Sequence, residues 1–104
     1  MTRPVEISRT AWQSIFDQLD RDVERVEEFT RVELVREIEF LAEHFDTLPV
    51  HDDVLFGSGR RLTQQEPQLR ALSFFHLFAR LAEGDMIVVY HVDIWLHGQR
   101  DRPS

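Results

Sequence analysis

The chain has 104 residues, a formal net charge of −7 and no cysteine. This length suits one domain with a single hydrophobic core, and the lack of cysteine excludes disulfides and thiolate metal sites. No apolar run approaches the roughly 20 residues needed to span a bilayer. The N-terminus also lacks the apolar stretch of a signal peptide. The sequence therefore predicts a soluble, cytoplasmic protein.

Charge is distributed unevenly along the chain. Residues 1–53 carry 14 acidic side chains against 6 arginines, whereas residues 54–104 carry 5 acidic side chains against 6 arginines. An acidic total argues against non-specific phosphate binding over the whole surface. It leaves room for a local patch of arginine and histidine in the second half.

The N-terminal residues 1–8 predict a short strand. Val5 and Ile7 alternate with polar neighbours, so both would lie on one face of the strand. Ser8 or Thr10 would then open a helix, because their hydroxyls are suited to an N-cap.

Residues 9–46 predict two acidic helices that form an antiparallel hairpin. Apolar residues recur there at helical intervals, with acidic side chains on the opposite face. Thr30 and Glu33 have the spacing of a capping box, which places the break between the helices near residues 28–30. The apolar stripes must be covered, and the C-terminal sheet is the available partner.

The strongest strand signal lies in residues 68–97. It follows a loop-rich connection over residues 47–67, with a short strand or turn at Val54–Phe56. Three β-prone runs, with a tight turn at Glu83-Gly84 between the last two, predict three antiparallel strands. Residues 98–104 form a polar tail. The predicted fold is a single α+β domain with an N-terminal strand, an antiparallel helical hairpin and a three-stranded antiparallel meander in one sheet.

The turn at Glu83-Gly84 sets a register for the last two strands. It would place one apolar face under the helices and His76 directly opposite His91. The other, open face would then be half apolar and half basic. Its residues would be His76, Phe78, Arg80, Ile87, Val89 and His91.

Arginine and histidine on this open face form the first candidate site. The set is His76, Arg80 and His91, with Arg70 on the preceding strand and His97 beyond the last. Arginine supplies a fixed cation for phosphate, and histidine exchanges protons near neutral pH. The set could therefore hold an RNA backbone and cleave it through attack by a 2′-hydroxyl. The alternative is an ordinary solvated face on which polar residues alternate outward.

Cross-strand histidines could also form a metal site. His76 and His91, with Asp93, would provide two imidazoles and a carboxylate. Zinc needs three or four ligands in a fixed geometry, and the spacing matches no zinc motif such as HExxH. We therefore predict no bound metal and no cofactor.

A glycine-rich segment precedes an arginine pair in the predicted connection. Gly57-Ser58-Gly59 is followed by Arg60 and Arg61. A glycine-rich loop can hold phosphate, but this one lacks the spacing and the lysine of a P-loop. We interpret it as a surface turn, whose arginines would reach a nucleic acid if the turn borders the sheet face.

Two surfaces could bind a partner protein. The run Ile94–Leu96, with Trp95 at its centre, is either the edge of the core or an exposed partner-binding patch. The acidic helix faces are either a solvated surface or a docking site for a basic partner.

The order of elements resembles the RelE/ParE toxin superfamily of small bacterial and phage proteins. These have an N-terminal strand, a helical hairpin and an antiparallel sheet. Val5–Ser8 followed by Ala11 is similar to the family's opening strand and first helix. Pro67–Leu72 is similar to its LRELR strand, Phe75–Leu81 to its YRVLYRV segment, and Glu83–Val89 to its polar turn followed by IVVL. The resemblance runs over nearly the whole chain and implies the fold of this family.

The resemblance implies a toxin of a type II toxin–antitoxin system that acts as a ribosome-dependent mRNA endonuclease. Arg70 matches an arginine that members use near the scissile phosphate, and His76 stands where active ribonucleases carry arginine. His91 and His97 are the nearest substitutes for a catalytic Tyr or His after the last strand. The implied phosphate-binding residues are Arg60, Arg61, Arg70 and Arg80.

A cognate antitoxin is the main partner that the resemblance implies. It would lie along the groove between sheet and helices and contact the apolar part of the open face. The partner-binding residues would be Phe74, Phe78, Val89 and Trp95. The ribosome with its mRNA, or gyrase, would be further partners, and exposed apolar surface would also permit a homodimer.

The competing interpretation is a non-enzymatic interaction protein. A ParE-like gyrase inhibitor, or a phage or mobile-element modulator of a host protein, would need no catalytic residues. The acidic helices would then be the working surface.

Overall fold

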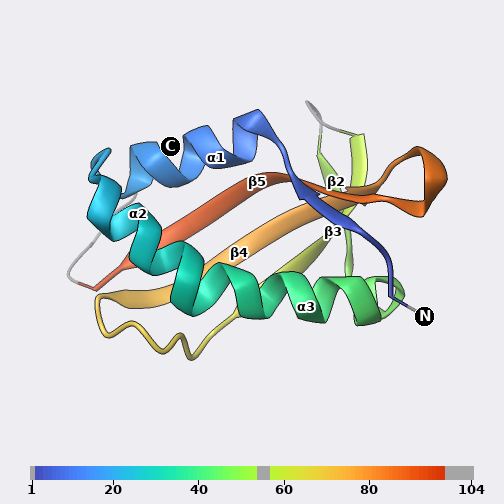
Figure 1. The fold of residues 1–104 in the computed structure, drawn as a ribbon. Helices are drawn as coiled ribbons and strands as arrows, with labels where there is room; N and C mark the ends of the chain where they lie inside the picture. Colours follow the sequence, from blue (N-terminus) through green and yellow to red (C-terminus); the bar gives the residue numbers. More distant parts are fainter. Residues whose placement is uncertain (1, 54–56, 98–104) are drawn as a thin grey trace.

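The fold is an α+β arrangement of a mixed five-stranded sheet with helices on one face (Figure 1). The computed structural model describes residues 2–53 and 57–97, so the segment predicted at Val54–Phe56 and the tail 98–104 lie outside the described residues. Within the described residues, no helix is both long enough and apolar enough to cross a membrane. The elements are β1 (Val5–Ile7), α1 (Arg9–Gln18), α2 (Val23–Phe29), the π-helix η1 (Thr30–Leu34), α3 (Val35–His44), η2 (Phe45–Thr47), β2 (Val50–Asp53), β3 (Gly57–Gln64), β4 (Leu72–Leu81), η3 (Glu83–Asp85) and β5 (Ile87–Leu96).

The strands lie in the order β1-β5-β4-β3-β2. β1 runs parallel to β5, and the other neighbours are antiparallel. The predicted N-terminal strand is confirmed, and an antiparallel meander is present, but the first of its three strands was wrongly placed. Residues 68–71 form turns, and the third strand of the meander is β3, inside the segment 47–67 that was predicted to be loop. The expected three-stranded sheet is therefore a five-stranded one.

The two helical segments run in opposite directions on the same side of the sheet and splay apart (Figure 1). The predicted break at residues 28–30 is wrong. The chain turns instead at Asp20 and Arg21, which both adopt positive φ, and Asp22 caps α2 by accepting from two backbone N–H groups. From α2 to α3 the helix is continuous.

The predicted break coincides with the π-helical turn η1. Thr30 does not cap a new helix; its hydroxyl donates to the carbonyl of Val26 at 2.8 Å. The carboxylate of Glu33 points away from the helix and accepts from the backbone of the β3–β4 loop. A capping-box spacing and a π-turn with a buried acid thus look alike in sequence, and single π-turns often occur at functional sites.

The core lies between the helices and the near face of the sheet. β4 and β5 contribute alternate residues to it, and the aromatic contact between Phe29 and Phe75 joins the two layers, with ring centroids 5.2 Å apart. Burial of this apolar surface is the main stabilising contribution. The largest fully buried apolar residues are Ile15, Phe29, Leu34, Leu41, Phe75, Leu77, Ile87, Val89, Val92 and Ile94.

The register of β4 and β5 differs from the predicted one. The loop between β4 and β5 is one residue longer than expected, since Leu81 pairs with Ile87 and not with Met86. Tyr90 is then skipped as a bulge, because the pairing shifts between Phe78 and its neighbour. Together these shifts place His76 opposite Asp93 and not opposite His91.

The shifted register also changes the composition of the open face. Val89 and Ile87 were expected there, but both are fully buried on the helix side. His91 instead pairs with Phe78. The face away from the helices is therefore less aliphatic and more aromatic than the sequence suggested.

Polar side chains of α1 close the free edge of β5 beyond its pairing with β1. Thr10, Ser14 and Gln18 recur every four residues and so share one helix face. Thr10 donates to a β5 carbonyl at 3.0 Å, and Ser14 accepts from the N–H of Val92 at 3.2 Å. Gln18 donates to the carbonyl of Val92 at 2.6 Å and accepts from the N–H of Ile94 at 2.7 Å. The helix thus replaces a neighbouring strand.

We predict that Gln18→Ala lowers the free energy of unfolding by about 1–3 kcal/mol, because it leaves part-buried backbone groups of β5 without partners. Urea denaturation followed by circular dichroism measures the change. Gln13→Ala, at an exposed position of the same helix, is the control and should change stability little. Equal effects of the two substitutions would contradict this role for Gln18.

Candidate functional site

The sheet face opposite the helices carries a connected set of aromatic and histidine rings. We call it the aromatic face. Among the described residues, no helix covers it (Figure 1). Its rings are those of His51, Phe74, His76, Phe78, Tyr90, His91 and Trp95.

A stacked pair forms one end of the aromatic face. Phe74 and Trp95 lie nearly parallel, at an interplanar angle of 15° and with centroids 4.6 Å apart. The ring of His76 stands edge-on to both, at 5.4 Å from each. All three side chains are partly exposed, so they offer flat apolar surface to a ligand. Such surface suits the stacking of a planar group.

Phe78 is the centre of the aromatic face. Its ring lies 4.6 Å from His51, 6.0 Å from His76 and 5.8 Å from His91. Because these neighbours surround it, Phe78 itself is only 8% exposed. Three histidines from three strands therefore stand around one buried aromatic ring.

Hydrogen bonds orient two of these histidines. Nδ1 of His76 lies 2.8 Å from the hydroxyl of Thr63 on β3. Nε2 of His91 lies 3.3 Å from a carboxylate oxygen of Asp93 on the same strand. A partner on one ring nitrogen fixes the orientation of the imidazole. Both histidines are therefore held in defined positions for proton exchange.

The predicted arginines divide between the two faces. Arg61 pairs with Phe78, which places it on the aromatic face, and it is exposed. Arg80 is exposed on the same face, two residues along β4 from Phe78. Arg60 turns to the helix side, where its guanidinium donates to the carbonyl of Leu48 at 2.7 Å and lies 5.5 Å from the centroid of a phenylalanine ring. The aromatic face thus has two exposed arginines.

Arg70 and His97 lie at the end of the sheet that carries the Phe74–Trp95 pair. Arg70 is exposed in the loop before β4, and His97 is exposed directly after β5. The two segments are joined because the N–H of His97 donates to the carbonyl of Ala71 at 3.0 Å. Of the predicted catalytic set, His76 and His91 stand on the aromatic face, and Arg70 and His97 stand at its end.

The partner-binding residues expected on this face are found there, with one exception. Phe74, Phe78 and Trp95 belong to the aromatic face. Val89 lies on the opposite side of the sheet and is fully buried. The prediction that Val89 lies on this face is therefore wrong, because the pairing of β5 with β4 is shifted relative to the predicted register.

Glu33 holds the loop that carries Arg70. Its side chain is fully buried, and its two oxygens accept from the N–H groups of Gln68 and Leu69, both at 3.2 Å. The guanidinium of Arg36 lies 3.2 Å from the same carboxylate. The sequence contained a signal for this role, since Glu33 occupies a position four residues after a buried phenylalanine, in the apolar stripe of the helix.

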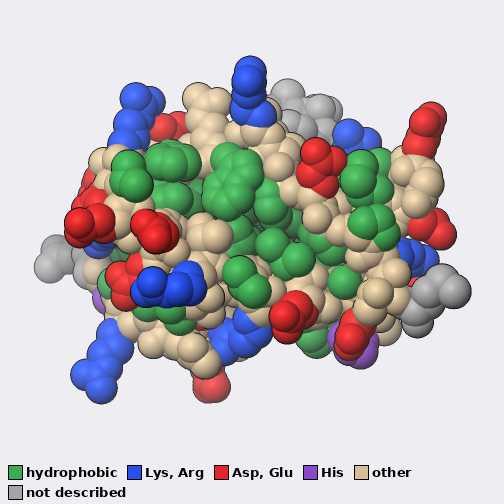
Figure 2. Space-filling model, in the orientation of Figure 1, with side chains coloured by type: hydrophobic (Ala, Val, Ile, Leu, Met, Phe, Trp, Pro, Cys, Tyr) green, Lys and Arg blue, Asp and Glu red, His purple; other side chains and the backbone are tan. Residues whose placement is uncertain are grey.

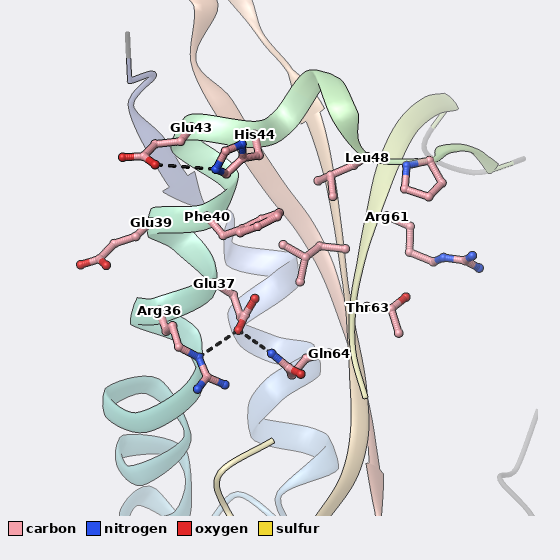
Figure 3. A pocket seen from close by; sticks show the side chains of 12 residues that line it. Arg36, Glu37, Glu39, Phe40, Glu43, His44, Leu48, Arg61, Thr63 and Gln64 are labelled. Atoms are coloured by element: carbon pink, nitrogen blue, oxygen red, sulfur yellow. Dashed lines mark hydrogen bonds and ion pairs between the residues drawn. The ribbon is translucent and has the colours of Figure 1, made fainter. Parts of the chain in front are cut away.

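A cavity of about 800 Å³ opens between α3 and β3 (Figure 3). Phe40 points into it, and Glu37 closes one end by accepting from Arg36 and Gln64 at 3.2 and 3.0 Å. This cavity was not predicted from the sequence, because the strand β3 was not predicted. It lies beside the edge of the sheet and not on the aromatic face.

In the described part of the chain, no group of three or more His, Asp or Glu side chains is placed so that it could hold a metal ion.

Comparisons with protein-family models, curated proteins and solved structures found no match. Function must therefore be inferred from the geometry of this chain.

We predict that Glu33→Ala lowers the free energy of unfolding by about 2–4 kcal/mol, because two loop N–H groups and a guanidinium lose their buried partner. Amide hydrogen exchange at Gln68 and Leu69 should accelerate more than elsewhere. Glu28→Ala, on the exposed surface of α2, is the matched control. Unchanged exchange in the loop would contradict the anchoring role of Glu33.

Proposed function

We propose that this protein is a RelE/ParE-like toxin that binds single-stranded RNA on the aromatic face and cleaves it there. The observation that carries the proposal is the arrangement of partly exposed stacking rings, oriented histidines and exposed arginines on one helix-free sheet face. Proteins that bind single strands combine aromatic platforms for the bases with cations for the backbone.

Bases would stack on the Phe74–Trp95 end of the aromatic face. Each base has a π-face, so stacking there needs no particular sequence. Arg61 and Arg80 would contact phosphates, since the guanidinium matches phosphate oxygens with paired donors. The chain as a whole has a net charge of −7, which disfavours non-specific binding of RNA over the rest of the surface.

His76 and His91 would carry out the cleavage. One imidazole would take the proton of a 2′-hydroxyl as its oxygen attacks the adjacent phosphorus. The 5′-oxygen would leave with a proton from the other imidazole, which gives a 2′,3′-cyclic phosphate and a 5′-hydroxyl. Arg61 would stabilise the charge that develops on the phosphate. Such cleavage requires no metal.

The element order supports the toxin assignment. The strand, paired helices and antiparallel meander follow one another as the resemblance to the RelE/ParE superfamily implies. An mRNA target would place the activity in the cytoplasm. A cognate antitoxin would then be required to protect the host.

A second candidate function is protein binding without catalysis. Apolar side chains gather at the surface between α1 and α3, with acidic and basic side chains around them (Figure 2). This surface suits an antitoxin or another protein that buries it. The elements that border this surface are β1, α1 and α3. They contribute the partly buried residues Val5, Ile7, Trp12, Phe16 and Ile38.

We predict that induced expression in a bacterial host arrests growth and creates new mRNA 5′ ends within translated codons. His76→Ala should abolish the new ends, because it removes a proton-transfer group. His44→Ala, on the exposed surface of α3, is the control and should leave them unchanged. Arrest without new ends would favour the binding function, and absence of both would count against a toxin acting in that host.

A further inference from the structure

β2, the edge strand of the sheet, is shorter than its neighbour β3. β2 pairs with β3 only as far as Arg60, and the last bond is from the N–H of Arg61 to the carbonyl of Pro49 at 3.0 Å. Beyond Pro49 the two chain segments separate. The second half of β3 is therefore bordered by β4 on one side only.

Thr63 presents its backbone N–H and C=O at this open edge. The N–H of Arg61 points away from β4, and residues two apart in a strand point the same way. Thr63 therefore directs both groups away from β4. Within residues 2–53 and 57–97, neither has a backbone hydrogen-bond partner.

Along β5, at the other side of the sheet, backbone groups that no strand pairs with have partners of another kind. Three polar side chains of α1 form hydrogen bonds with them. No described side chain does the same for Thr63, and its own hydroxyl is engaged with His76. Unpaired strand edges are templates for pairing with another chain. The edge of β3 beyond Arg60 is thus left without a partner among the described residues.

The cavity between α3 and β3 lies directly along this edge (Figure 3). Its apolar surface comes from Phe40, Leu48, Pro49 and Leu62, and Phe40 is 44% exposed. A strand added beside Thr63 would send alternate side chains to this helix side. The cavity would receive two apolar side chains, at positions i and i+2 of that strand.

The side chain at position i+1 of the added strand, between the two apolar ones, would point to the other face of the sheet. There it would lie beside Thr63 and Arg61, which both carry their side chains on that face. Arg61 is exposed and forms no ion pair with the described residues. A carboxylate is the complementary group, because arginine binds carboxylates through paired donors.

We propose that the free edge of β3 binds an extended segment of a partner protein with the pattern apolar–acidic–apolar. The segment would extend the sheet where β2 ends. The acidic residue would exchange both backbone hydrogen bonds with Thr63, and the flanking apolar side chains would enter the cavity beside Phe40. Strand addition of this kind takes affinity from the backbone and specificity from alternate side chains.

The test uses a labelled, end-blocked peptide of sequence Ser-Leu-Glu-Leu-Thr and its N-methylated forms. Fluorescence anisotropy with the full chain measures binding. N-methylation of the central Glu should weaken binding about tenfold, because it removes a hydrogen bond to the strand. N-methylation of the first Leu is the matched control and should change little, because that N–H points to solvent.

Two variants separate this site from the proposed RNA site. Phe40→Ala should weaken peptide binding and leave RNA binding unchanged, whereas Trp95→Ala should do the reverse. Equal effects of the two N-methylations, or no binding of the peptide, would overturn the proposal. So would dimerisation in analytical ultracentrifugation that Phe40→Ala abolishes, because the occupant would then be a second copy of the chain.

Discussion

The pairing of β4 with β5 under the helices is the constraint on which the functional surface depends. Side chains alternate between the two faces of a strand, so burial of Leu77 and Val92 under the helices sends His76 and His91 to the opposite face. The bulge in β5 then shifts the pairing, and the two histidines flank the ring of Phe78 instead of facing each other. A polar pair was expected, and an aromatic platform with histidines around it is found.

The parts of the fold with clear periodicity could be predicted from sequence. The N-terminal strand, the helices and the last two strands have apolar residues at intervals of two or of three to four. The strand β3 could not be predicted in this way. Gly57, Gly59 and the arginine pair interrupt its alternation of polar and apolar residues, and Leu62 is its only buried aliphatic residue. Its strand conformation comes from its neighbours. A side chain at Gly59 would also meet the carbonyl of Ala79 at 2.7 Å, so this glycine marks a close approach of strands.

The site was predictable by residue type but not by geometry. His76, His91 and Arg61 were identified from their chemistry, and all three lie on the aromatic face. Their neighbours depended on a connection one residue longer than expected and on a bulge, and neither has a local sequence signature here. For Glu33, the position in the apolar stripe of the helix is visible in the sequence. Its partners are not, because they are backbone groups 35 and 36 residues away.

The most direct test of the account is the affinity of the chain for a short fluorescein-labelled single-stranded RNA, compared with Trp95→Ala and Phe40→Ala. Phe40 is exposed and Trp95 is partly exposed, but of the two only Trp95 lies on the aromatic face. Loss of one stacked base costs about 1–3 kcal/mol, so Trp95→Ala should weaken binding by about 5- to 150-fold. Phe40→Ala should bind like the unmodified chain. Equal affinities of the two variants, or no measurable binding of this RNA by the unmodified chain, would contradict the assignment of RNA binding to the aromatic face.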